Sequence, residues 1–281
     1  MTRFENDQTD PSPRPNGDAE GKSATLLEAK DLTVRYGELT IVDGVEFTLR
    51  EGDWLMLIGP NGAGKSTIVN AVSQGAPYTG EIRYCGRDLK RMRPREIARG
   101  IGVLSQTHFV GYAFTVGSVV RLGRYAHSGG AFGRRSAEDE RLVRLALERT
   151  GLTQLEEQSV LTFSGGELQR TFLAQIFAQN PKVLVLDEPT NHLDLVYQKQ
   201  VFGLIREWLQ TPGRAVISVV HDLSLAKAYG TRALLLDHGK TVAQGTLGDV
   251  FTPEHLDGAY GMDVSAWMRG LLDQWREDEQ A

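Results

Sequence analysis

The chain has 281 residues, of which 41% are hydrophobic and 24% are charged, and its formal net charge at neutral pH is −5. This length fits one large domain or two closely joined ones, with enough apolar residues for a core. The acidic balance argues against a general nucleic-acid binder, the single cysteine excludes a disulfide scaffold, and no apolar run approaches the roughly 20 residues of a membrane span.

The N-terminal stretch is polar and contains Pro11, Pro13 and Pro15 without a hydrophobic segment. Such a composition makes a poor signal peptide, and one cysteine in the whole chain suits a reducing compartment. We therefore expect residues 1–24 to be a disordered tail of an intracellular protein.

Short β-prone runs follow this tail. They lie at Leu26–Val34 and Val45–Leu49, and glycine-containing pairs at Tyr36-Gly37 and Asp43-Gly44 predict turns between them. A third apolar run of strand length, Trp54–Ile58, comes next.

A glycine-rich segment after this third strand fits the pattern G-x-x-x-x-G-K-[ST]; it reads Gly59-Pro60-Asn61-Gly62-Ala63-Gly64-Lys65-Ser66-Thr67. A helical segment, Ile68–Val72, follows directly. Between a strand and a helix, the glycines let backbone N–H groups converge on an anion at the helix N-terminus. Lys65 can then reach the outer phosphates of a nucleotide and Ser66 can ligate Mg²⁺.

A basic cluster comes after the next short strand, Gly80–Gly86, and consists of Arg83, Arg87, Lys90, Arg91, Arg93, Arg95 and Arg99. A nucleic-acid surface is one interpretation. Interrupting acids and the near absence of aromatic residues favour a solvated face, or an edge that meets anionic lipid or a protein partner.

The segment Gly100–Leu104 has the pattern of a buried strand and ends at Ser105-Gln106. Helical and loop-like sequence then continues to about Asn180, including an amphipathic helix at Glu138–Thr150. We expect a helical insert at about residues 94–178.

A second glycine-containing helix start lies at Ser164-Gly165-Gly166-Glu167. Ser164 and Glu167 fit a capping box, which by itself would account for both residues. Capping does not explain two successive glycines, which leave the helix N-terminus open to an anion, so we predict a phosphate-facing role.

The run Val183–Leu186 is apolar and β-prone, which indicates a parallel strand buried on both faces. Asp187 and Glu188 follow at its carboxyl end, where open α/β sheets bind ligands. Asp187 suits the Mg²⁺ shell, and Glu188 suits a general base that acts on the attacking water.

A helix is expected at Val196–Leu209, and a second buried strand at Ala215–Val220 ends at His221. A histidine at this sheet edge favours a chemical role. A hairpin is expected at Ala233–Gln244, and residues 251–281 are expected to form a short helical tail.

Together these motifs resemble the ATP-binding subunit of an ABC transporter over about Leu26 to Gly245. The resemblance assigns Gly59–Thr67 to the Walker A loop, Gln106 to the Q-loop, and Ser164-Gly165-Gly166-Glu167 to the signature, with glutamate where many members have glutamine. It assigns Val183–Glu188 to Walker B, Asp194 to the D-loop and His221 to the switch histidine. Tyr36 falls where the family stacks an aromatic ring on adenine, although a strand-edge tyrosine remains an alternative.

The resemblance implies an α/β P-loop ATPase of the ABC type, with an N-terminal antiparallel β subdomain and the helical insert, occupying residues 25–250. It implies that Lys65, Glu188 and His221 take part in hydrolysis and that Ser66, Gln106 and Asp187 surround Mg²⁺. The implied cofactors are ATP and Mg²⁺. Two copies would form a homodimer, and the signature residues would act on the nucleotide of the partner subunit.

Two stretches, Thr115–Tyr125 and Asn191–Asp194, are similar to importers of iron–siderophore, haem and cobalamin complexes. On this interpretation the chain lies on the cytoplasmic face of the membrane, bound to permease subunits and assisted by a substrate-binding protein. No nucleic acid is expected as a partner. The alternatives are an importer of another substrate, a soluble ABC ATPase that acts on nucleic acid or ribosomes, and a nucleotide-binding regulator without turnover.

Overall fold

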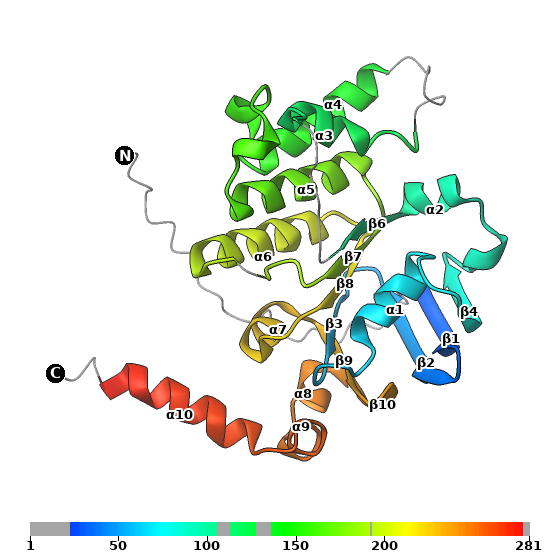
Figure 1. Cartoon of the computed structure of the whole chain (residues 1–281), viewed down its shortest axis with the longest axis vertical. Coiled ribbons are helices and arrows are strands. Elements are labelled where there is room, and N and C mark those ends of the chain that lie inside the picture. The colour runs from blue at the N-terminus through cyan, green and yellow to red at the C-terminus, as the bar shows by residue number, and fades with distance from the viewer. Residues whose placement is uncertain (1–22, 106–112, 128–135, 192, 278–281) are drawn as a thin grey trace.

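The computed structural model describes residues 23–105, 113–127, 136–191 and 193–277, so most of the expected N-terminal tail, and Gln106, lie outside the described residues. The described part forms two sheets with helices around them (Figure 1). The strands are β1 (Thr25–Tyr36), β2 (Leu39–Arg50), β3 (Trp54–Ile58), β4 (Thr79–Tyr84), β5 (Arg87–Asp88), β6 (Ile101–Leu104), β7 (Val183–Asp187), β8 (Ala215–Val219), β9 (Arg232–Asp237) and β10 (Lys240–Thr246). The helices are α1 (Lys65–Val72), α2 (Pro94–Gly100), α3 (Val116–Leu122), α4 (Ala137–Arg149), α5 (Gly165–Gln179), α6 (Leu195–Leu209), α7 (Leu223–Tyr229), α8 (Leu247–Val250), α9 (Pro253–Tyr260) and α10 (Val264–Glu277), with short 3₁₀ turns η1 (Leu89–Arg91), η2 (Thr153–Leu155) and η3 (Val160–Thr162).

The main sheet has six strands in the order β10-β9-β3-β8-β7-β6, and all of its pairs are parallel except β10–β9. Successive side chains of a strand point to opposite faces, so β3 contributes Trp54, Met56 and Ile58 to one hydrophobic core and Leu55 and Leu57 to the other. Burial on both faces explains the uninterrupted apolar runs of these strands. The predicted α/β fold with a parallel sheet is confirmed.

The smaller sheet has the antiparallel order β2-β1-β4-β5 and shares a core with α1 and one face of the main sheet. This sheet is the predicted β subdomain. The turn predicted at Asp43-Gly44 is wrong, because both residues lie inside β2. Gly44 has a φ of 62° at an irregularity in the β1–β2 register, and its N–H donates to Thr33 Oγ1 at 3.0 Å. A β-bulge and a turn favour the same residue types, and only the pairing of the strands on either side distinguishes them.

Helices α3, α4 and α5 pack together above the main sheet (Figure 1), and α4 corresponds to the amphipathic helix predicted at Glu138–Thr150. β6, which the expected insert includes, belongs instead to the main sheet.

The segment expected as a C-terminal tail packs partly on the core, since Leu256 and Ala259 of α9 are buried there. Helix α10 extends beyond α9 (Figure 1) and exposes apolar side chains, among them Trp267 and Trp275. Within the described ranges, no helix is both long and apolar enough to cross a bilayer.

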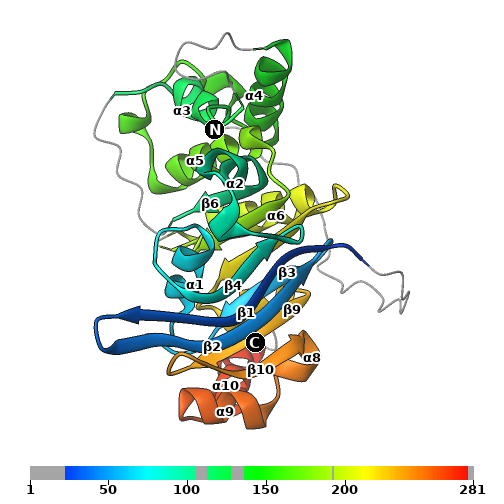
Figure 2. The same cartoon turned by 90° about the vertical axis from the view of Figure 1, so that its right-hand side faces the viewer.

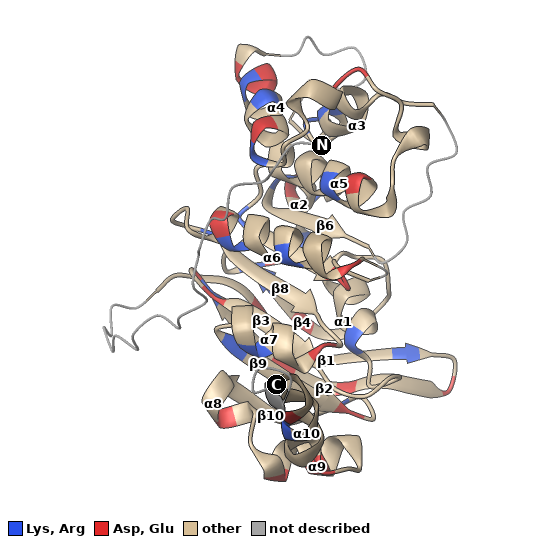
Figure 3. Cartoon of the chain, turned by 90° about the vertical axis from the view of Figure 1, so that its left-hand side faces the viewer, with Lys and Arg blue, Asp and Glu red and all other residues tan. Residues whose placement is uncertain are grey.

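A buried ion pair joins helices α3, α4 and α5. Arg124, just after α3, donates from Nε to Asp139 Oδ1 of α4 at 2.8 Å, and its NH1 donates to the carbonyl oxygens of Ala178 and Gln179 near the end of α5 at 2.9 and 3.0 Å. Elsewhere on α4, acidic and basic residues occur together on the surface (Figure 3). Hydrogen bonds from Ser136 and Arg124 lower the pKa of Asp139 to about 2, so the pair is charged at neutral pH.

Arg124→Met should destabilise the protein by about 3 kcal/mol at neutral pH, because it leaves Asp139 buried and unpaired. Arg141→Met is the matched control. It removes an exposed pair with Glu138 and should cost far less stability, because solvent screens an exposed ion pair. Because the pKa of Asp139 in the folded protein is below the ordinary 3.8, its ionised form contributes stability that is present above pH 3.8 and is lost as the pH falls through about 2. Denaturant titrations should therefore show that the difference in free energy of unfolding between Arg124→Met and wild type shrinks in acid. Equal losses of stability in Arg124→Met and Arg141→Met would contradict a stabilising role for the buried pair.

Candidate active site

The phosphate-binding loop runs from the end of β3 to the start of α1, as predicted, and its glycines are required by its path. Gly59 has a φ of 138°, and an added Cβ would lie 2.0 Å from the carbonyl oxygen of Leu236. Gly64 has a φ of 94°, and its Cβ would lie 2.9 Å from the carbonyl oxygen of Ile41. A side chain at either position would force the loop away from β9 or β2.

Lys65 is buried against this loop and is 4% exposed. Its Nζ donates to the carbonyl oxygens of Gly59 and Pro60 at 2.7 and 2.8 Å. Burial lowers the pKa of Lys65, while the nearby carboxylates of Glu188 and Asp187 oppose this effect. The ammonium group thus lies at the N-terminus of α1, close to two acids, where it can bind a phosphate.

Ser66 Oγ donates to Asp187 Oδ1 at 3.0 Å, which brings together two of the residues predicted to surround the metal. Burial raises the pKa of Asp187, the Ser66 hydrogen bond opposes this, and the charge of Glu188 adds to it. A hydroxyl and a carboxylate oxygen are ligands that Mg²⁺ prefers, and a divalent cation would stabilise the buried charge. No cluster of three His, Cys, Asp or Glu side chains placed to hold a metal ion occurs in the described ranges.

Glu188 begins the segment after β7 with a φ of 51°, in the left-handed region that non-glycine residues seldom adopt. Its N–H donates to the carbonyl oxygen of Val219 in β8 at 3.2 Å. Its Oε1 lies 2.6 Å from His221 Nε2, and Asn191 Nδ2 donates to its Oε2 at 2.8 Å. The strained backbone and these two contacts fix the carboxylate at the sheet edge.

The sequence analysis missed two polar contacts around this acid, those of Asn191 and Gln169. Gln169 of α5 donates from Nε2 to the carbonyl oxygen of Pro189 at 2.7 Å and so ties the signature helix to the segment after Glu188. An amide close in sequence to a candidate base is the signal that could have indicated Asn191. Gln169 carries no comparable local signal.

The signature segment forms the predicted capping box. Ser164 Oγ accepts the N–H of Glu167 at 3.4 Å, and Glu167 Oε2 accepts the N–H of Ser164 at 2.9 Å. The bonds from Ser164 lower the pKa of Glu167. Among the described residues, a Cβ at Gly165 would meet nothing within 4 Å, whereas one at Gly166 would clash with the ring of Tyr197 at 2.5 Å. Packing against Tyr197 therefore explains the glycine at position 166, while Gly165 leaves the start of the helix sterically open.

The signature helix α5 and the phosphate-loop helix α1 pack on opposite faces of the main sheet. Asp194 caps α6 by accepting the N–H of Tyr197 at 2.9 Å, and beyond it Leu195 and Val196 are 81% and 64% exposed. Tyr36 is half-exposed at the end of β1, and its stacking on adenine stays a prediction. Gln106 lies outside the described residues.

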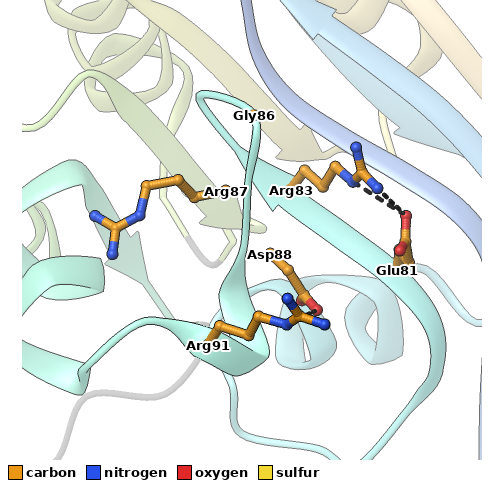
Figure 4. Close-up of a pocket in the computed structure, with 6 residues that line it drawn as sticks. All are labelled: Glu81, Arg83, Gly86, Arg87, Asp88 and Arg91. Carbon is orange, nitrogen blue, oxygen red and sulfur yellow. Dashed lines mark hydrogen bonds and ion pairs between the residues drawn. The ribbon is translucent and has the colours of Figure 1, made fainter.

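Three residues of the predicted basic cluster, Arg83, Arg87 and Arg91, line a separate hollow of about 350 Å³ on the β subdomain (Figure 4). Its arginines have acidic neighbours: Arg83 pairs with Glu81 at 2.9 Å, and Arg91 lies 4.0 Å from Asp88. Arg95 and Arg99 both donate to the carbonyl oxygen of Ala126. These contacts give the cluster a structural role, so it adds nothing in favour of the nucleic-acid alternative.

Residues 42–191 match the sequence profile of the family described as ABC transporter. The chain belongs to the ABC transporter family. This ABC ATPase is 36% identical over 242 residues to the ferric enterobactin transport ATP-binding protein FepC of Escherichia coli K12, covering 86% of the chain and 89% of FepC. It is 39% identical over 243 residues to the hemin import ATP-binding protein HmuV of Streptomyces coelicolor, covering 86% of the chain and 85% of HmuV.

The same ABC ATPase is 34% identical over 241 residues to the ABC transporter ATP-binding protein YvrA of Bacillus subtilis, covering 85% of the chain and 54% of YvrA. Among solved structures it is similar to a metal-chelate type ABC transporter in an inward-facing conformation, with a TM-score of 0.73 and 26% identity. The match covers 84% of this chain and 89% of the other. The fold and the ATP-hydrolase class predicted from the motifs are confirmed.

Asp187→Asn should raise the melting temperature of the nucleotide-free protein at neutral pH. Because the pKa of Asp187 in the folded protein is above the ordinary 3.8, its protonated form contributes stability that is fully present below pH 3.8. This stability is lost as the pH rises through the pKa of the folded protein. The neutral amide avoids that loss and can still accept from Ser66, so its advantage should disappear in acid. Thermal melts over this pH range provide the measurement.

The matched control is Asp263→Asn, which changes an exposed carboxylate that accepts the N–H of Ala266. It should shift the melting temperature little at any pH. A lower melting temperature for Asp187→Asn than for wild type at neutral pH would contradict the burial argument.

Proposed function

We propose that this chain is the ATP-hydrolysing subunit of an importer for a metal chelate, bound on the cytoplasmic face of the membrane to a separate permease. The observation that carries the hydrolytic part is the convergence of Lys65, Asp187 and Glu188 at one sheet edge. The import part rests on the relatives, whose names assign them to ferric enterobactin transport and hemin import.

Each group has a separate task in the proposed reaction. Lys65 and the loop N–H groups bind the outer phosphates, and Ser66 and Asp187 hold Mg²⁺, which neutralises charge on the phosphate oxygens when bound. Glu188 accepts a proton from the attacking water. His221 donates from Nε2 to Glu188 Oε1, and this bond, with that of Asn191, keeps the carboxylate oriented.

The geometry within one chain supports a homodimer. The signature glycines and the phosphate loop belong to helices on opposite faces of the sheet. Gly165 is sterically open at the start of α5, and the apolar side chains of Leu195 and Val196 are exposed at the start of α6. A two-fold related copy would supply its signature to this chain's nucleotide and cover those side chains.

Glu188→Gln should slow hydrolysis by at least about 100-fold and trap an ATP-dependent dimer, because the amide cannot take the proton while the phosphate contacts persist. Phosphate release and size-exclusion chromatography with light scattering in ATP and Mg²⁺ measure both effects. Adding Lys65→Ala to this variant is the control and should abolish the dimer. A Glu188→Gln protein that stays monomeric in saturating ATP would contradict the homodimer.

A groove of about 420 Å³ supports the proposed contact with a permease. It lies where the end of α1, the turn η1, helix α2 and strand β6 meet. It is lined largely by apolar side chains, namely Leu89, Met92, Pro94, Ile97, Ala98, Ile101 and Val103, with Ser73, Gln74, Lys90 and Gln179. β6 leads directly to Gln106, so a permease segment in this groove would touch the strand that precedes the predicted Q-loop.

Deleting the gene for this chain in its host should reduce uptake of one of three labelled substrates at least tenfold: a ferric siderophore, haem or cobalamin. Wild type should restore uptake and Ala98→Glu should not, since a charge in the groove would exclude an apolar segment. Ala137→Glu, on the exposed first turn of α4, is the matched control and should restore uptake.

The two parts of this proposal fail separately. Unchanged uptake of all three substrates after deletion would overturn the metal-chelate assignment. Full restoration by Ala98→Glu would overturn the groove as the permease contact but leave the substrate assignment in place.

A further inference from the structure

Helix α9 is a structural part of the ATPase core. Leu256 and Ala259 are buried against the main core, and α9 contacts both β9 and β10. Thr252 caps its start by accepting the N–H of His255 at 3.3 Å, and Gly261 ends it with a φ of 66°. The helix lies below β9 and β10 (Figures 1 and 2). Its last residue, Tyr260, is therefore held in a defined position.

Tyr260 reaches the beginning of the phosphate loop. Its hydroxyl accepts the N–H of Gly59 at 3.1 Å, a contact that spans 201 positions of sequence. Gly59 is also limited by β9, because a Cβ there would lie 2.0 Å from the carbonyl oxygen of Leu236. Strand β9 and Tyr260 together leave this glycine little freedom.

The peptide groups on either side of Gly59 link Tyr260 to Lys65. The N–H of Gly59 donates to Tyr260, and its carbonyl oxygen accepts from Lys65 Nζ at 2.7 Å. Rotating Gly59 would break the first bond and move the carbonyl oxygen that holds the ammonium group. Burial raises the pKa of Tyr260, so the phenol stays protonated at neutral pH.

We propose that Tyr260 is a positioning residue for nucleotide binding, which acts by holding Gly59 and, through it, the phosphate loop and Lys65. The phenol makes this contact from a helix that follows every active-site motif in the sequence. A hydroxyl that served merely to anchor α9 would affect stability and leave nucleotide affinity unchanged.

The test compares Tyr260→Phe with wild type in the full chain. Titration calorimetry with ADP and Mg²⁺ should show affinity weakened about fivefold, the loss expected for one neutral hydrogen bond. The KM for ATP should rise by a similar factor, and kcat should stay within about twofold, because the reacting groups are unchanged. The amide proton resonance of Gly59 should shift upfield when its hydrogen bond is lost.

Leu256→Ala is the control for a purely structural role. It weakens the packing of α9 but keeps the hydroxyl, so it should lower the melting temperature more than Tyr260→Phe does and change ADP affinity less than twofold. ADP affinity in Tyr260→Phe that is weakened at least threefold, and more than in Leu256→Ala, supports the proposal. Any smaller loss, or one no greater than that of Leu256→Ala, overturns it.

Discussion

The parallel pairing of β3, β8 and β7 is the constraint on which the active site depends. Leu57 pairs with Val219, and Val219 pairs in turn with Asp187, so the carboxyl ends of the three strands lie at one edge. From that edge the phosphate loop leaves β3, Glu188 follows β7 and His221 follows β8. The N–H of Glu188 bonds to the carbonyl oxygen of Val219 and continues the ladder one residue beyond the strand. A shift of one register step would separate these groups, and burial of both faces opposes such a shift.

The same edge concentrates charge where water is scarce. Lys65 is 4% and Asp187 is 6% exposed, and burial disfavours the charged form of each, lowering the pKa of the amine and raising that of the acid. Their mutual attraction opposes both shifts. In the proposed function, a nucleotide triphosphate with its divalent cation would supply the missing partners, an anion for Lys65 and a cation for Asp187. The burial of both charges therefore supports the proposal that the site takes the nucleotide together with its cation.

The parts predictable from sequence are those whose signals are local. The glycines of the phosphate loop, the capping box of Ser164 and Glu167, and the apolar run before Asp187 each follow from a few consecutive residues, and the structure contains all three. The contacts of Gln169 and Tyr260 depend on how distant elements pack, and no local pattern indicates them. The bulge at Asp43-Gly44 was misread for the same reason. Gln106 and the adenine contact of Tyr36 stay predictions.

The arrangement of the two glycine-containing helix starts limits what one chain can do. The phosphate loop is enclosed by groups of its own chain: β9 behind Gly59, β2 behind Gly64 and α9 through Tyr260. In the described part of the chain nothing encloses the start of α5 at Gly165, although its Ser164–Glu167 box satisfies the local backbone groups. A helix start that is capped yet sterically open is suited to an anion brought by another molecule. Because α5 is tied through Gln169 to the segment after Glu188, an anion bound at the start of α5 would also affect the position of Glu188, the proposed base.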